Sequence, residues 1–294
     1  MKQACIAAME RLKQGATAND AVEVAIKVLE DASVTNAGIG SNLNRVGLVE
    51  CDAAIMCSKP DAFGAVGSVS AICNPIEAAN AVLKSYAKGP NRHGLVPPMF
   101  LVGEGADKWA RDHGICTNMD SRHKITEAAL RKYEQYMDFV TSPALDKEPE
   151  TTVGNASENT NALDEDVLLD TVGAVCIDMD KVIAAGVSSG GIALKHPGRI
   201  GEAAMFGCGS WAEELTDKTK KPTVLVGTSV TGTGEQIMRT MLAKNCAQPS
   251  TDIFTSLSDC FEKFNNSRSL ELYTTKNAGI IMVRHDLGSN STGT

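Results

Sequence analysis

The residues best placed for chemistry in this sequence lie at the junction of Asp170 and Thr171. Residues 141–170 carry eight acids against one base and no aromatic residue, so they cannot bury enough apolar surface to offset the entropy lost on ordering. From Thr171 to Ile177 the chain turns apolar and β-branched, which is typical of a buried strand. A threonine released as a new N-terminus can use its own α-amine, with a pKa of about 8, as the base for its hydroxyl. The junction therefore suits a threonine nucleophile made by chain cleavage, and an ordinary surface loop entering a strand is the alternative.

Three polar stretches follow the threonine along the chain. Residues 188–191, Ser-Ser-Gly-Gly, place hydroxyls and exposed backbone at the end of a predicted strand. Arg199, held by a Pro-Gly turn, could fork onto a substrate carboxylate, and Glu202 could hold an ammonium or cap a helix. Residues 231–235, Thr-Gly-Thr-Gly-Glu, lie between a strand and a helix, where backbone N–H groups can stabilise an oxyanion. Each stretch alone is equally compatible with a turn or a helix cap.

A glycine-bearing loop, residues 36–42, lies in the first half of the chain. Its spacing is wrong for a dinucleotide-binding fingerprint and for a P-loop. A tight turn explains it as well as a functional loop does.

The elements that must position these residues are predicted from hydrophobic periodicity. Helices are predicted over residues 1–12, 19–31, 76–86, 106–113, 126–140, 233–244 and 253–264. Strands are predicted over 49–56, 65–72, 97–102, 171–178, 182–187, 223–230 and 278–283, with a loop at 188–201. Asn19 is predicted to cap the second helix. Helices dominate the first half and strands cluster after residue 171, which favours helices layered on packed sheets over a strict βαβ alternation.

Composition sets further bounds on the function. The net charge is −8, and the acidic stretch 141–170 accounts for −7 of it, so the near-neutral remainder predicts no nucleic-acid surface. Nine cysteines without a CxxC pair predict neither a disulfide framework nor a zinc site, and they indicate a reducing compartment, cytoplasmic and/or nuclear. No apolar stretch approaches the ~20 residues of a membrane span. No metal or cofactor is predicted.

Taken together and in this order, the motifs resemble the asparaginase-type N-terminal-nucleophile hydrolases, a family that includes plant-type asparaginases, isoaspartyl peptidases, glycosylasparaginase and taspase. The matching segments are TNAGIGSNLN (35–44), VECDAAIM (49–56), FGAVGSVS (63–70), DTVGAVCID (170–178), SSGGIALKHPGRIGEAAMFGCGSWAE (188–213) and TGTGE (231–235). The resemblance implies an α/β fold, a four-layer α-β-β-α sandwich forming one structural unit. Its α-subunit portion is 1–170, with a flexible acidic linker at 141–170, and its β-subunit portion is 171–294. It also implies self-association into heterodimers and dimers of them.

The resemblance also implies roles for individual residues. Thr171 is implied as the nucleophile, released by cleavage after Asp170, with Ser189 as a second hydroxyl beside it. Thr231 and Gly232 match the oxyanion-stabilising pair. The residues implied to bind substrate are Asn36, Arg199, Glu202, Thr231, Gly232, Thr233 and Gly234.

Several motifs favour the taspase branch: SNLN, SSGG, GCGSWAE and the aspartate before Thr171. They predict an endopeptidase that cuts protein substrates after aspartate, at an internal Asp-Gly-like site. Thr231 and Glu202 are closer to the asparaginase pattern, so an asparaginase or isoaspartyl peptidase acting on small substrates is the alternative. A third interpretation is an inactive, truncated member that acts as a binding protein, because the family's first strand, with a His-Gly-Ala-Gly-like run, has no match here.

Overall fold

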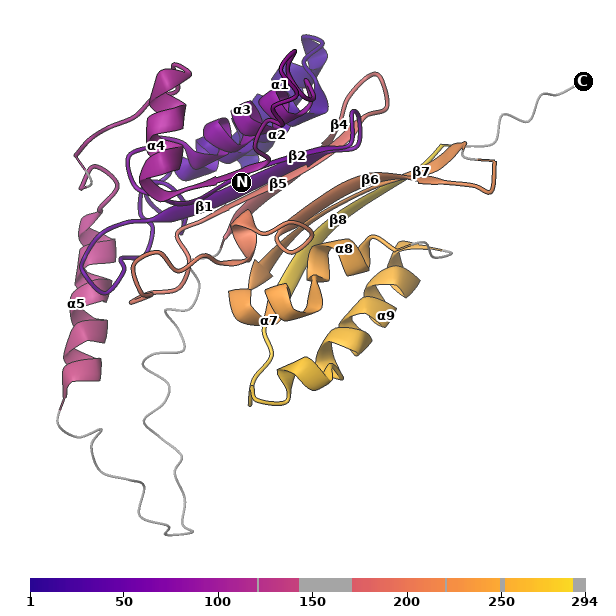
Figure 1. Cartoon of the computed structure of the whole chain (residues 1–294). Coiled ribbons are helices and arrows are strands. Elements are labelled where there is room, and N and C mark those ends of the chain that lie inside the picture. Colours follow the sequence, from indigo (N-terminus) through magenta and orange to yellow (C-terminus); the bar gives the residue numbers. More distant parts are fainter. Residues whose placement is uncertain (121, 143–170, 220, 249–251, 288–294) are drawn as a thin grey trace, which may run out of the picture.

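The computed structural model describes residues 1–120, 122–142, 171–219, 221–248 and 252–287 (Figure 1). The predicted linker lies outside the described residues from 143 onward, and so does Asp170. Within the described residues, two β-sheets lie face to face and helices cover their outer sides (Figure 1). The predicted combination of packed sheets and layered helices is therefore confirmed.

The larger sheet has five strands in the order β3-β2-β1-β5-β4. Its strands are β1 (Cys51–Cys57), β2 (Ala62–Val69), β3 (Phe100–Val102), β4 (Val172–Ile177) and β5 (Ile183–Ser189). β1 pairs antiparallel with β2 and β5, β4 pairs antiparallel with β5, and β2 runs parallel to β3. Strands from before and after the predicted linker therefore share one sheet. Every residue of β1 and β5 is buried, and most of their side chains are apolar or small.

The smaller sheet is antiparallel and packs closely on the larger one. Its strands are β6 (Ser210–Thr216), β7 (Pro222–Gly232) and β8 (Ala278–Asp286). A Cβ added to Gly173 would lie 2.0 Å from Ser229 Oγ, and one added to Gly227 would lie 2.6 Å from Val175 Cγ1. These glycines let the two sheets approach where β4 crosses β7. The close approach brings Thr171, just before β4, near the end of β7.

Helices form the two outer layers (Figure 1). The helices of the larger sheet are α1 (Lys2–Lys13), α2 (Ala18–Glu30) and α3 (Pro75–Tyr86), and those of the smaller sheet are α7 (Gly234–Thr240), α8 (Leu242–Cys246) and α9 (Ile253–Asn265). The other helical elements are α4 (Gly103–Asp112), α5 (Glu127–Thr141) and the 3₁₀ turns η2 (Glu202–Ala204) and η3 (Arg268–Leu270). Figure 1 places α5 to one side of the layers. None of the helices in the described ranges is long and apolar enough to cross a membrane.

The structure differs from the sequence predictions at three local features. The strand at 210–216 was not predicted, because two consecutive glutamates interrupt its apolar pattern. The helix predicted over 233–244 is broken at Met241, whose left-handed φ of 45° separates α7 from α8. The cap of α2 is Thr17 and not Asn19, since the Thr17 hydroxyl accepts a hydrogen bond from the backbone of the first helical turn at 3.4 Å.

Candidate active site

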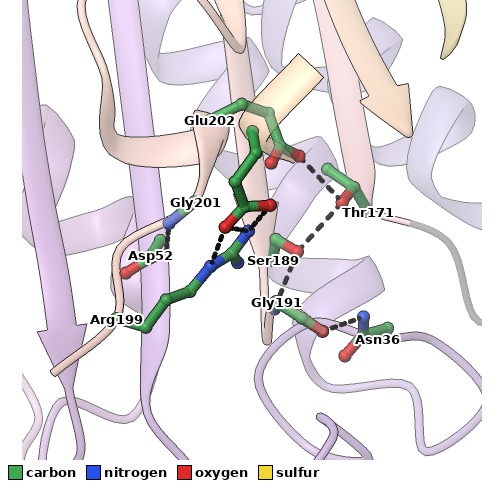
Figure 2. A network of polar contacts seen from close by, with 9 residues as sticks. Asn36, Asp52, Thr171, Ser189, Gly191, Arg199, Gly201 and Glu202 are labelled. Carbon is green, nitrogen blue, oxygen red and sulfur yellow. Dashed lines mark hydrogen bonds and ion pairs between the residues drawn. The ribbon is translucent and has the colours of Figure 1, made fainter. Parts of the chain in front are cut away.

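Thr171 directly precedes β4, and its hydroxyl faces a cavity (Figure 2). Its Oγ1 lies 2.9 Å from Ser189 Oγ and 3.3 Å from Glu202 Oε1. Ser189 is the last residue of β5, and the neighbouring residues Ser188 and Val172 face each other in the β4–β5 register. The sheet itself therefore sets the contact between the two hydroxyls. A hydroxyl with one hydroxyl and one carboxyl neighbour can be both oriented and relieved of its proton.

The turn after Ser189 is tied to the glycine-bearing loop of the first half. The N–H of Gly191 donates to Ser189 Oγ at 3.0 Å, and Asn36 donates from Nδ2 to Gly191 O at 2.9 Å (Figure 2). Asn42 also donates from Nδ2 to Gly191 O, at 2.9 Å. A Cβ added to Gly190 would lie 2.5 Å from a loop side chain, so only glycine allows the approach. The structure thus brings Asn36 to the cavity. Asn42, in the SNLN motif, was not among the nominated site residues.

Glu30, the last residue of α2, holds this loop and the neighbouring strand β5 through hydrogen bonds. It is fully buried, and its Oε1 accepts hydrogen bonds from Ser188 Oγ at 2.6 Å and from Ile76 N at 3.0 Å. Its backbone carbonyl accepts from Ile39 N at 2.7 Å, within the loop. Burial raises the pKa of Glu30 to about 7, against the lowering effect of the hydrogen bond from Ser188. Sequence reasoning missed Glu30, because a glutamate at the end of an amphipathic helix carries no signal of its own.

Arg199 lies on the loop between β5 and η2 and lines the cavity. Its guanidinium is held side-on by Glu235: Oε1 accepts from Nε at 2.9 Å and from Nη2 at 2.8 Å, and Oε2 accepts from Nη2 at 2.7 Å. Glu235 closes the TGTGE motif, yet it was not nominated as a site residue. Nothing in the sequence places it against Arg199, which lies 36 residues earlier.

Glu202 opens η2 and is 4% exposed. Burial raises the pKa of its carboxyl to about 7, against the lowering effect of the nearby Arg199. The loop carrying both residues is fixed by Asp52, whose carboxylate accepts hydrogen bonds from Gly201 N and Ser68 N, each at 2.8 Å. When ionised, Glu202 is a buried carboxylate beside the Thr171 hydroxyl and is suited to hold a cation.

One cavity of about 600 Å³ collects the nominated residues. Those that line it are Asn36, Thr171, Ser189, Arg199, Glu202, Thr231, Gly232, Thr233 and Gly234. The lining residues that were not nominated include Asn42, Lys132, Tyr136 and Asn277. At the end of β7, a Cβ on Gly232 would lie 2.3 Å from Asn277 O, so glycine is required there. Among the residues described, no three His, Cys, Asp or Glu side chains are grouped to hold a metal ion.

Comparison with known proteins decides the family. A family model described as "Asparaginase" matches residues 1–291. The chain belongs to the asparaginase family. As a member of the asparaginase family, it is a hydrolase of the threonine, N-terminal-nucleophile type.

Individual relatives agree with this assignment. Plant-type L-asparaginase of Thermococcus kodakarensis is 36% identical over 247 residues, which cover 84% of this chain and 71% of that protein. Isoaspartyl peptidase/L-asparaginase of Xenopus laevis is 33% identical over 244 residues, 83% of this chain and 66% of that protein. Isoaspartyl peptidase of Escherichia coli is 33% identical over 236 residues, 80% of this chain and 64% of that protein. This member of the asparaginase family thus spans about two thirds of the length of these relatives.

These relatives do not support the taspase branch, which the sequence motifs favoured. The motifs that favoured this branch are divided between the cavity and the core. Ser189 of SSGG and Asn42 of SNLN line the cavity, whereas Trp211 of GCGSWAE is 5% exposed within the core. Thr231 and Glu202, the two positions closer to the asparaginase pattern, both line the cavity. In this asparaginase-family chain the cavity lining thus includes residues of both patterns, and the relatives are what favour the asparaginase branch.

Proposed function

We propose that this chain hydrolyses asparagine and isoaspartyl peptides, attacking the aspartyl side-chain carbonyl through Thr171. The observation that carries the proposal is the position of the Thr171 hydroxyl, 2.9 Å from Ser189 Oγ and 3.3 Å from Glu202 Oε1, in a cavity shared with Arg199. The names of the relatives, L-asparaginase and isoaspartyl peptidase, support the same substrates. The order of helices, sheet, sheet and helices supports the four-layer α-β-β-α sandwich of N-terminal-nucleophile hydrolases.

The nucleophile needs a free N-terminus, which self-cleavage between Asp170 and Thr171 supplies. Thr171 Oγ1 attacks the carbonyl carbon of Asp170, the acyl group moves from nitrogen to oxygen, and water hydrolyses the resulting ester. The products are the α-subunit portion 1–170 and the β-subunit portion 171–294. Because β1 and β5 pair within one sheet, the two portions remain together as a heterodimer, and we expect two such units to associate.

In the cleaved protein, the α-amine of Thr171 takes the proton from Oγ1, which attacks the side-chain carbonyl carbon of the substrate. Ser189 orients Oγ1, and Thr231 and Gly232 are the proposed donors to the oxyanion. Ammonia, or the amine of an isoaspartyl peptide, leaves with the proton held by the α-amine. The aspartyl ester on Thr171 is then hydrolysed by water, which releases aspartate and restores the hydroxyl.

Two charged groups suit this cavity to an amino-acid substrate. Arg199 pairs with the α-carboxylate, and ionised Glu202 pairs with the α-ammonium. A polypeptide cut at an internal Asp-Gly bond brings no ammonium to Glu202, so the buried carboxylate would stay unpaired. This argument favours small substrates over the endopeptidase function. A binding protein without activity gives no reason for the Thr171 hydroxyl to lie between a second hydroxyl and a buried acid.

Mass spectrometry and three substrates test the proposal on one preparation. We expect two chains, with Thr171 at the new N-terminus, and a single chain for Thr171→Ala. Thr171→Ser keeps a hydroxyl and is the matched control, which we expect to cleave itself. Asparagine and a β-aspartyl dipeptide should be hydrolysed, and a peptide with an internal Asp-Gly bond should stay intact. If only the peptide with the internal Asp-Gly bond were cleaved, the endopeptidase hypothesis would be favoured instead. A single chain that hydrolyses none of the three substrates would favour a binding protein.

A further inference from the structure

Glu235 holds the proposed carboxylate anchor from outside the cavity. Both nitrogens on one edge of the Arg199 guanidinium, Nε and Nη2, donate to the Glu235 carboxylate at 2.7–2.9 Å. Arg199 lines the cavity, whereas Glu235 does not. The Arg199 side chain is 14% exposed and that of Glu235 is 40% exposed, so this pair is less screened by water than an ion pair on an open surface. The geometry therefore fixes the plane of the guanidinium before any substrate arrives.

The third guanidinium nitrogen, Nη1, is left without a partner. It is buried and has no hydrogen-bond acceptor among the described residues. A Cβ added to Gly191 would lie 3.1 Å from Nη1, and one added to Gly201 would lie 2.9 Å from it. Gly191 also lines the cavity, so no side chain at that position separates Nη1 from the site. Because an unpaired buried donor is unfavourable, Nη1 is the nitrogen best placed to gain from a ligand oxygen.

The ion pair also sets the charge that a ligand meets. Glu235 cancels the positive charge of Arg199, and the acids Glu202 and Asp52 also act on Arg199 electrostatically. Two lysines lie close to the site: Lys195, whose Nζ donates to the backbone carbonyl of Glu50 at 2.7 Å, and Lys132, which lines the cavity. Glu235 therefore lowers by one unit the positive charge that a second ligand carboxylate meets at the site. L-asparagine carries one carboxylate and one ammonium, whereas L-aspartate carries an additional carboxylate.

We propose that Glu235 is a positioning and specificity-determining residue, which orients Arg199 toward the α-carboxylate and weakens the binding of dicarboxylic ligands such as L-aspartate. The inference rests on the proposed function, in which L-aspartate is the product. An enzyme that retained its product would be inhibited by it. Glu235 thus has two effects on Arg199. It holds the guanidinium in the orientation that binds the substrate carboxylate, and it neutralises the positive charge that would otherwise strengthen binding of the product.

Two substitutions separate these properties. Glu235→Gln keeps a carbonyl oxygen that can accept from Nε and Nη2, and it removes the negative charge. We expect the inhibition constant of L-aspartate to fall about tenfold, because this ligand carries a net negative charge that gains from the uncancelled charge of Arg199. The KM for asparagine should stay within about threefold, because its carboxylate is balanced by its own ammonium. Glu235→Ala removes the acceptor as well. For it we expect the KM for asparagine to rise about tenfold with kcat changed by less than about threefold, since Arg199 is no longer held.

The control is Glu262→Gln, the same charge change on the exposed face of α9, which should leave both constants unchanged. Calorimetric affinity for L-aspartate is measured on the wild type and on Glu235→Gln whether or not they turn over substrate. Equal affinities, or no binding to either protein, would overturn the inference. A wild type that hydrolyses neither asparagine nor a β-aspartyl dipeptide defeats the proposed function instead. Thermal unfolding of each variant shows that the folded protein is being compared.

Discussion

Replacing Glu202 with glutamine should make the protein more stable at alkaline pH and poorer at holding an amino acid. Glu202 is 4% exposed, and burial raises the pKa of its carboxyl from 4.5 to about 7. The difference between these values means that ionising Glu202 destabilises the fold by about 3 kcal/mol, at about 1.4 kcal/mol per pKa unit. Glutamine has the same shape and stays neutral, so this destabilisation disappears.

The sign follows from the protons that each state binds. Between pH 4.5 and about 7 the unfolded chain has lost the Glu202 proton while the folded protein still holds it. The free energy of unfolding therefore falls as pH rises through this window and levels off above it. Burial also raises the pKa of Glu30 to about 7, so Glu30 adds a similar slope of its own. From pH 5 to pH 8, the wild type should lose about 2–3 kcal/mol more stability than Glu202→Gln.

Urea unfolding at pH 5 and pH 8 measures this difference directly. Glu30→Gln is the matched control: it makes the same change at a fully buried acid outside the cavity, and should remove the other slope. Equal losses of stability in the wild type and in Glu202→Gln would refute the reasoning. Substrate binding gives a second readout, since the ammonium needs ionised Glu202. The KM for asparagine should rise as pH falls below about 7 in the wild type, and not in Glu202→Gln.

Three further outcomes are expected. Arg199→Lys keeps the charge but loses the planar fork, so its kcat/KM for asparagine should be roughly 10- to 100-fold lower than that of the wild type in the same assay. Gly173→Ala would place a Cβ 2.0 Å from Ser229 Oγ, so unfolding free energy in urea should fall by about 1–3 kcal/mol, and adding Ser229→Ala should restore part of it. Cys73 donates its N–H to Cys116 O at 2.9 Å, and, after burial, the neighbouring Cys116 side chain raises the pKa of the Cys73 thiol. Oxidised glutathione should therefore join them in a disulfide detectable by peptide mass mapping and absent in Cys116→Ser.

The sequence could predict that the site residues lie close together, because several of them lie at the ends of strands. Thr171 precedes β4, Ser189 ends β5 and Thr231 stands near the end of β7. These strands read clearly from their apolar runs, and a packed pair of sheets brings such ends together. The order of motifs along the chain then indicated the family. What each motif contacts was beyond this reasoning, which is why Trp211 of GCGSWAE, a buried core residue, was taken as a sign of a branch.

The residues that sequence reasoning missed depend on contacts between distant segments. Glu235 binds an arginine on another loop, and Glu30 bonds a serine on β5 from the end of α2. A glutamate at either position looks like a solvated charge, because periodicity reports which face is apolar and says nothing of a buried acid. The break at Met241 is of the same kind: α8 packs on β6 and β7, and this packing outweighs the local preference for one continuous helix.

Glu202 links the stability of this protein to its choice of substrate. Ionised Glu202 destabilises the fold by about 3 kcal/mol, which is a large fraction of the 5–15 kcal/mol by which a typical domain is stable. A ligand ammonium offsets this effect by pairing with the carboxylate, so bound amino acid should stabilise the protein most above pH 7. A peptide with an internal Asp-Gly bond has no ammonium to offer, so it should give no such increase. Thermal unfolding of Thr171→Ala with asparagine or the peptide therefore tests the substrate class without any turnover, and equal stabilisation by both would show that Glu202 does not choose between them.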